Sequence, residues 1–177
     1  GLASDAGDVT IVLSNHLGRN ARVPWSYALD NAEEELAFAR HTFARIHGER
    51  AKAWEVRVGD EAAGAARLAS AIDRGLFDAL RACFPSSGKA RLVSVQPHLM
   101  SAFNHWRSRL ARDAWFLVVE PQRACIALRS KGRWAAVRNA RGEFDDAAAW
   151  VDLLERERYR VEVDAPDEVA VFAPRQT

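Results

Sequence analysis

The sequence is short of the features that mark several large classes of protein. It has no strong excess of either charge, since 25 lysines and arginines stand against 24 aspartates and glutamates for a net charge of +1. A balance of this kind gives no overall field that would attract nucleic acid or a membrane surface. The longest apolar run, at 114–119, has the length of a strand. A membrane-spanning helix needs ~18 apolar residues, so no membrane segment is expected in this sequence.

Cysteines and signal-peptide features are also scarce. The two cysteines, Cys83 and Cys125, form no metal-binding or redox motif and stand among apolar neighbours. This setting predicts two buried, reduced thiols. The first residues, 1–5, have neither a basic head nor an apolar stretch, so we expect no signal peptide there. Together these features predict a cytoplasmic protein.

Motifs for catalysis are absent as well. The sequence has no P-loop, no dinucleotide-binding glycine pattern, no Gly-x-Ser-x-Gly elbow and no pair of adjacent glycines. Its histidines are not spaced four apart on a helix, and no Cys-x-x-Cys accompanies them, which argues against a zinc site. The sequence therefore predicts no enzyme activity, no cofactor and no metal.

What the sequence does contain is an alternation of short β-type runs and longer amphipathic segments. Apolar residues recur every second residue in the short runs and every third or fourth residue in the longer ones. The pattern predicts strands at 9–13, 21–25, 53–58, 67–72, 90–95, 114–120, 124–129, 134–138 and 169–172. It predicts helices that begin near Asp30, Asp73, His98 and Asp145. The predicted fold class is mixed α/β, with strand meanders and crossover helices.

The helix predicted at 98–111 stands between two sets of elements. We expect residues 98–112 to connect a first lobe, at 1–97, with a second lobe, at 113–177. The first two strands are expected to pair as a hairpin, and Pro24 indicates that the second of them lies at an edge or contains a bulge. The strand at 114–120 is apolar on both faces, which predicts a central position in its sheet.

Two stretches carry a resemblance to a known family. Residues 91–104 read as a strand that leads into a helix with Phe103 and Asn104, and residues 115–121 open a three-stranded meander. With the order of elements, these stretches resemble the actin-like ATPase superfamily, and more narrowly its pilus-assembly (PilM-type) and secretion (GspL-type) branch. The resemblance implies two small lobes of actin-like, RNase H-like type. Function does not follow from such a likeness alone.

The resemblance also implies where nucleotide would bind. ATP-binding members have two phosphate loops, each after the first strand of a lobe and each with Asp for the metal and Gly for close approach of backbone amides. The matching positions here are 14–18, which has no carboxylate, and 120–123, which has no glycine. In the second, Pro121 lacks an amide hydrogen. The chain is also short for a complete member. We therefore expect a degenerate pseudo-ATPase that serves as a protein-binding scaffold in pilus or secretion assembly.

A basic segment is the main candidate for a binding face. Residues 121–142 contain several arginines and one lysine but no acidic residue. An acidic protein partner is expected to bind this segment and the edge near Pro24. The predicted binding residues are Trp25, Arg123, Arg129, Lys131, Arg133 and Trp134. Both tryptophans are expected to be exposed, because each stands beside proline or arginine on an outer strand, and tryptophan is a frequent interface anchor.

Other functions stay open at this point. An active nucleotide hydrolase would use Glu120 with residues near Asn15 and His16. A nucleic-acid-binding module would use the basic segment, with phosphate contacts and base stacking on Trp134. The segment also fits a solvated outer face with no ligand, and self-association of the chain is a further alternative.

Overall fold

The computed structural model of the chain describes residues 7–29, 31–85, 88–144 and 147–173. Its elements run in the order β1 (Gly7–Leu13), β2 (Arg19–Val23), α1 (Ala32–His47), the 3₁₀ helix η1 (Glu49–Ala53), β3 (Trp54–Val58), β4 (Arg67–Asp73), α2 (Arg74–Ala82), β5 (Ala90–Pro97), α3 (His98–Trp106), β6 (Ala114–Glu120), β7 (Arg123–Ser130), β8 (Arg133–Arg141), α4 (Ala147–Arg158) and β9 (Val169–Phe172). The mixed α/β class predicted from the sequence is confirmed.

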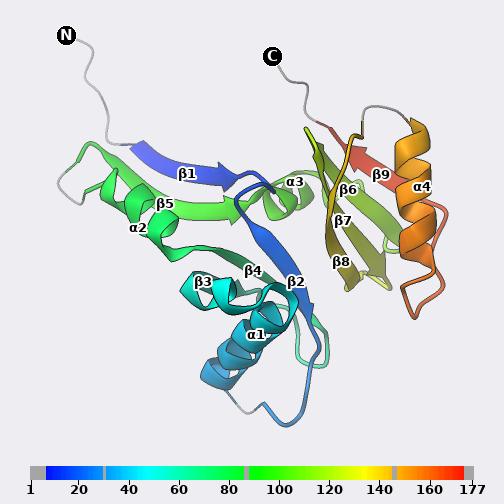
Figure 1. The fold of residues 1–177 in the computed structure, drawn as a ribbon, viewed down its shortest axis with the longest axis horizontal. Helices are drawn as coiled ribbons and strands as arrows, with labels where there is room; N and C mark the ends of the chain where they lie inside the picture. Colours follow the sequence, from blue (N-terminus) through cyan, green and yellow to red (C-terminus); the bar gives the residue numbers. More distant parts are fainter. Residues whose placement is uncertain (1–6, 30, 86–87, 145–146, 174–177) are drawn as a thin grey trace.

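The elements after α3, here called the C-terminal region, form one sheet in the order β8-β7-β6-β9 (Figure 1). β6 pairs antiparallel with β7 and parallel with β9, so it lies inside the sheet. Phe116 and Val118 face a core cluster shared with α3, whereas Trp115 and Leu117 face one shared with α4. The prediction of a central strand is confirmed, because both faces of β6 are covered.

The elements before α3, here called the N-terminal region, form two sheets. β1 and β5 pair in parallel, and a separate antiparallel sheet has the order β2-β4-β3. The apolar face of α1 packs on the second sheet through Ala39 and Phe43. The predicted β1–β2 hairpin is therefore wrong. The turn at 14–18 sends β2 into a different sheet, and alternation within a strand gives no information on which strand it pairs with.

The two regions pack directly against each other. Leu68 of β4 belongs to the same buried cluster as Val118 and Trp134 of the C-terminal sheet. β2 lies along β8, where Nε of Arg22 donates a hydrogen bond of 3.2 Å to the carbonyl oxygen of Trp134. β2 is the edge strand of its three-stranded sheet, so the edge position that Pro24 indicated is confirmed, and the side of β2 that faces β8 is covered by the C-terminal region.

Two helix boundaries differ from the prediction. α3 ends at Trp106 rather than 111, because the amide of Arg109 bonds to the Trp106 carbonyl at 2.8 Å and tightens the chain into a turn. The N-cap of α1 is Asn31, whose side chain accepts from the amides of Glu33 and Glu34. Asp30 and Asp145, near which two helices were predicted to begin, lie outside the described residues. Within the described residues, no helix has the length and apolar character needed to cross a membrane.

Candidate functional site

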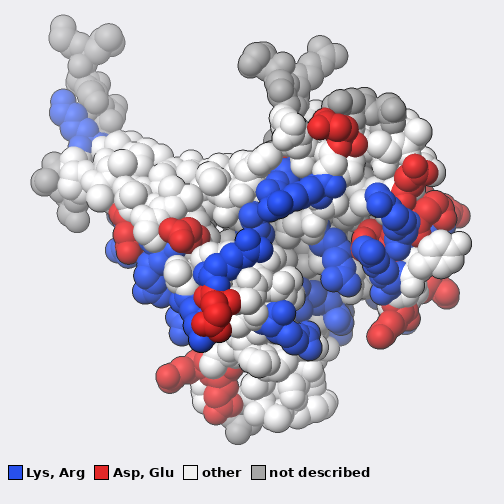
Figure 2. Space-filling view, in the orientation of Figure 1, with Lys and Arg blue, Asp and Glu red and all other residues white. Residues whose placement is uncertain are grey.

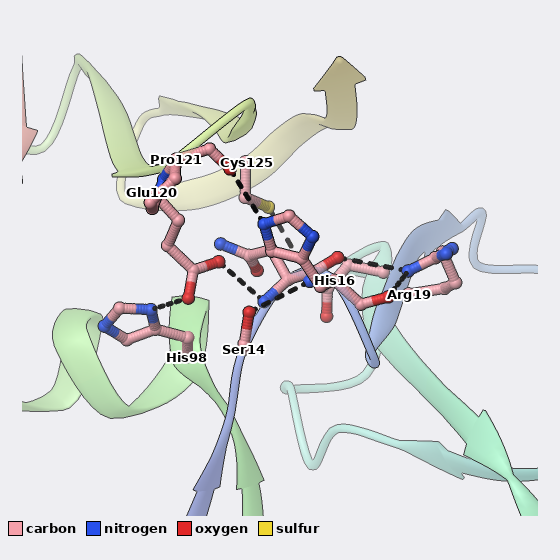
Figure 3. A network of polar contacts seen from close by, with 9 residues as sticks. Ser14, His16, Arg19, His98, Glu120, Pro121 and Cys125 are labelled. Atoms are coloured by element: carbon pink, nitrogen blue, oxygen red, sulfur yellow. Dashed lines mark hydrogen bonds and ion pairs between the residues drawn. The ribbon is translucent and has the colours of Figure 1, made fainter. Parts of the chain in front are cut away.

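Two turns that follow β1 and β6 lie in direct contact (Figure 3). One comprises residues 14–18, and the other begins at Pro121. The amide of Asn15 donates a hydrogen bond of 2.7 Å to Oε2 of Glu120, and Nε2 of His16 lies 2.8 Å from the carbonyl oxygen of Pro121. The positions that match the two phosphate loops of the actin-like family therefore contact each other.

The turn after β1 uses its backbone amides internally. The amides of Leu17 and Gly18 both donate to the carbonyl oxygen of Ser14, at 2.9 and 3.0 Å, and the amide of His16 donates to the Ser14 hydroxyl at 3.1 Å. The amide of Asn15 is bonded to the other turn, as described above. A phosphate loop needs amides that point freely at the ligand. The backbone amides of residues 15–18 therefore all donate hydrogen bonds to other groups of the protein.

The turn after β6 offers even fewer groups that could bind a phosphate. Pro121 has no amide hydrogen, and Gln122 adopts a left-handed conformation with φ 56°. The carbonyl oxygen of Gln122 accepts a hydrogen bond of 3.3 Å from the amide of Gly142. The carboxylate that a metal would need is that of Glu120, and both of its oxygens are bonded to protein groups. The two turns therefore do not fit a magnesium-bound polyphosphate.

Glu120 lies at the centre of this contact. Its Oε1 is 2.9 Å from Nδ1 of His98 at the start of α3, and its side chain is 11% exposed. Burial alone raises the pKa of Glu120, but hydrogen bonds from His98, the Asn15 amide and Ser14 together outweigh burial and hold the pKa below its ordinary value of 4.5. The ionised carboxylate thus joins β6 to α3 and to the turn after β1.

The pH dependence of folding is expected to report this carboxylate. A glutamate whose pKa is lowered in the folded state contributes stability that is complete above its unfolded pKa and is lost as the pH falls through the folded value. The stability difference between wild type and Glu120→Gln is therefore expected to shrink as the pH falls below about 4.5. Urea unfolding of both proteins across this range measures the difference. A difference that stays constant with pH would contradict this role.

A buried polar layer lies beside the two turns. The amide group of Asn20 donates to Sγ of Cys125 at 3.5 Å, and its side-chain oxygen accepts from the hydroxyl of Ser70 at 2.9 Å. Asn139 on β8 donates to the carbonyl oxygen of Asn20 at 3.4 Å. Burial raises the pKa of Cys125 to about 12, so the thiol is neutral at physiological pH and is a poor nucleophile. The layer therefore joins the two regions and carries no reactive group.

The two cysteines differ in environment. Cys125 is fully buried, so the sequence-based prediction of a packed thiol is confirmed there. Cys83 is exposed, and the same prediction is wrong for it. It lies at the end of α2, a short surface helix that contains no buried residue. Apolar neighbours in the sequence overstate burial on such a helix.

The two tryptophans named as interface anchors occupy different environments. Trp134 is 7% exposed, and its ring centroid lies 4.7 Å from that of Phe103 on α3. Its expected exposure is wrong, because side chains alternate along β8 and that of Trp134 lies on the sheet face covered by α3. Trp25 is half-buried just beyond β2, with its ring 3.9 Å from that of the exposed Tyr27. Only Trp25 remains a candidate anchor.

The basic segment does not form one free face. Arg129 bonds two carbonyl oxygens of its own region at 3.1 Å and lies 5.1 Å above the ring of Phe103. Arg133 reaches the carbonyl oxygen of Gly64 at 3.4 Å, and Lys131 is exposed. Arg123 lies away from these residues, opposite Arg141 at the other end of the β7–β8 pair. A role for these residues in binding a partner stays a prediction.

Sequence reasoning identified part of the contact between the turns and missed the rest. Asn15, His16 and Glu120, the residues assigned to a hydrolase, do come together. The Asn15 backbone amide, the His16 ring and both Glu120 oxygens bond to protein groups, whereas Nδ2 of the Asn15 side chain is buried without a hydrogen-bond partner in the described part of the chain. His98 was predicted to mark the start of a helix. In the structure it follows β5, the strand beside β1, and its ring reaches Glu120 at the end of β6. Among the described residues, no group of histidine, cysteine or acidic side chains could hold a metal ion.

Comparisons with known proteins agree with this architecture. No protein-family model and no curated protein matches the sequence. Among solved structures, a Bacteroides thetaiotaomicron protein with an actin-like ATPase fold and unknown function matches with a TM-score of 0.60 and 13% identity. That match covers 96% of this chain and 60% of the other.

Two further structures belong to bacterial envelope machines. A PilM–PilN type IV pilus biogenesis complex matches with a TM-score of 0.58 and 16% identity, over 94% of this chain and 62% of the other. The cytoplasmic domain of EpsL, an inner-membrane component of the Vibrio cholerae type II secretion system, matches with a TM-score of 0.55 and 11% identity, over 96% of this chain and 63% of the other. The chain thus spans less than two thirds of the structures that it matches. The resemblance predicted from the sequence is confirmed at the level of fold: this chain has an actin-like ATPase fold.

Proposed function

We propose that this chain is a non-catalytic actin-like domain that serves as a protein-binding scaffold. The observation that carries the proposal is the contact between the two turns, in which Asn15 donates to Glu120 at 2.7 Å where family members bind polyphosphate. Hydrogen bonds within the protein hold the two regions together there. A domain that needs no nucleotide to join its regions is suited to present a constant surface to partners.

The setting of this scaffold is part of the proposal. One matched structure is a complex of pilus biogenesis proteins, and another is a cytoplasmic domain of a secretion-system component. Both neighbours are components of larger assemblies. We extend that role, and a cytoplasmic location, to this chain. The buried clusters that join its regions support a rigid body of the kind that an adaptor needs.

Thermal unfolding in the presence of Mg-ATP tests the proposal against an active hydrolase. A ligand at 100 times its dissociation constant adds about 2.7 kcal/mol to the free energy of unfolding. For a protein of this size that corresponds to a rise of roughly 5–11 °C in Tm. We expect no rise at millimolar Mg-ATP beyond that given by magnesium sulfate at equal ionic strength. A rise specific to Mg-ATP, together with phosphate release, would establish the hydrolase instead.

A further inference from the structure

Four arginines from distant parts of the sequence lie near one another, since three of them act electrostatically on the fourth, Arg19. Arg19 begins β2, Arg50 lies in η1, Arg123 begins β7 and Arg141 ends β8. We call these four residues the arginine patch. Figure 2 shows that basic side chains run across the middle of the molecule in this view, from the N-terminal to the C-terminal region. The patch therefore exists only when the two regions are packed together.

The arginines of the patch form no ion pair in the part of the chain that the structure describes, although the charge of Glu120 acts on Arg123. Nη1 of Arg19 is held in place by the carbonyl oxygens of Asn15, His16 and Gly18, at 2.7–3.1 Å. The guanidinium is thus oriented by the backbone and keeps other donors for a ligand.

The arginines of the patch repel one another. Arg123 and Arg141 lie directly opposite in the antiparallel pair of β7 and β8, an arrangement of like charges that destabilises a sheet. The pKa of Arg19 is lowered mainly by burial and, to a smaller extent, by the charges of Arg123, Arg141 and Arg50. The pKa of Arg123 is also lowered, first by burial and second by the charge of Arg141. The negative charge of Glu120 acts in the opposite direction. A bound anion would relieve this repulsion.

We propose that the arginine patch binds a short acidic segment of a partner protein. This inference rests on the scaffold function proposed above and assigns its binding surface. Guanidinium groups bind carboxylates through paired, charge-assisted hydrogen bonds, so a row of arginines matches closely spaced Asp and Glu side chains.

The extent of the patch favours a peptide over nucleic acid. Acidic side chains lie beyond both ends of the basic run, where they would repel a continuing phosphate backbone (Figure 2). The net charge of +1 also provides no wider field to hold a long polyanion. An acidic segment of a few residues fits within these limits.

A direct binding experiment tests the inference with labelled hexaglutamate as the probe. Fluorescence anisotropy at low ionic strength is expected to show saturable binding to wild type. The double variant Arg123→Gln with Arg141→Gln is expected to bind roughly tenfold more weakly, since it removes two of the four positive charges of the patch. The matched control is Arg40→Gln with Arg107→Gln, which removes two exposed arginines outside the patch and should leave the affinity unchanged.

The outcomes separate this inference from the scaffold function. Equal loss of affinity in both double variants, or no binding by wild type, would overturn the inference and leave the scaffold function standing. Tighter binding of labelled hexadeoxythymidylate than of hexaglutamate, lost in the patch variant, would overturn it in favour of nucleic acid. Displacement of the peptide by Mg-ATP, together with a Tm rise specific to Mg-ATP, would contradict the scaffold function itself.

Discussion

Replacing Trp134 by alanine is expected to lower the free energy of unfolding by about 3–5 kcal/mol. The side chain is 7% exposed and shares a cluster with Leu99 of α3, Leu68 of β4 and Phe116 of β6. Its removal leaves a cavity where α3 and the two regions meet. We expect the surrounding side chains to fill this cavity only in part, because they belong to several different elements. Urea unfolding at neutral pH measures the loss.

Trp25→Ala is the matched control for this experiment. It removes the same side chain from a half-buried position beside Tyr27, which is 88% exposed. We expect a loss of about 1 kcal/mol, in the usual range for partly exposed sites. If both variants lose the same stability, Trp134 does not hold the junction as described. Full stability of Trp134→Ala with loss of a partner would restore its interpretation as an exposed anchor.

Glu120→Ala is expected to cost about 2–4 kcal/mol of folding stability, because it leaves the Asn15 amide and His98 without a charged partner at the junction of the two regions. Those two contacts measure 2.7 and 2.9 Å in the wild type. Glu120→Gln should recover part of the loss, since its amide oxygen can still accept one of the two hydrogen bonds. Urea midpoints of the three proteins at neutral pH give the comparison.

Glu143→Ala provides the control for Glu120→Ala. Glu143 is exposed in the loop after β8, so its removal changes the net charge equally without opening the junction. We expect its unfolding free energy to lie within about 0.5 kcal/mol of wild type. Similar losses for Glu143→Ala and Glu120→Ala would show that charge, rather than the contact between the turns, sets the stability.

The elements of this fold could be predicted because burial leaves a periodic trace in the sequence. Phe116 and Val118 alternate with Trp115 and Leu117, and the structure covers both faces of that strand. Pairing leaves no such trace. β1 was expected to pair with β2 but pairs with β5, about 80 residues away, because the turn at 14–18 redirects the chain.

The candidate site was partly predictable for the same reason. Glu120 and Asn15 stand at the ends of strands, where the resemblance to the family placed phosphate loops, and they do meet. That the two turns would bond to each other depends on how the regions pack, which no local pattern encodes. The same holds for the arginine patch, since Arg19 and Arg50 are far from Arg123 and Arg141 in the sequence. A run of charged residues in a sequence identifies charges that are adjacent along the chain, not charges that folding brings together.

Co-crystallisation with magnesium and a non-hydrolysable ATP analogue tests the central claim most directly. The account predicts that the hydrogen bond between the Asn15 amide and Glu120, 2.7 Å in the present structure, persists and that no triphosphate lies between the two turns. Electron density for the triphosphate and a metal ion between residues 14–18 and Glu120, with that hydrogen bond broken, would contradict it.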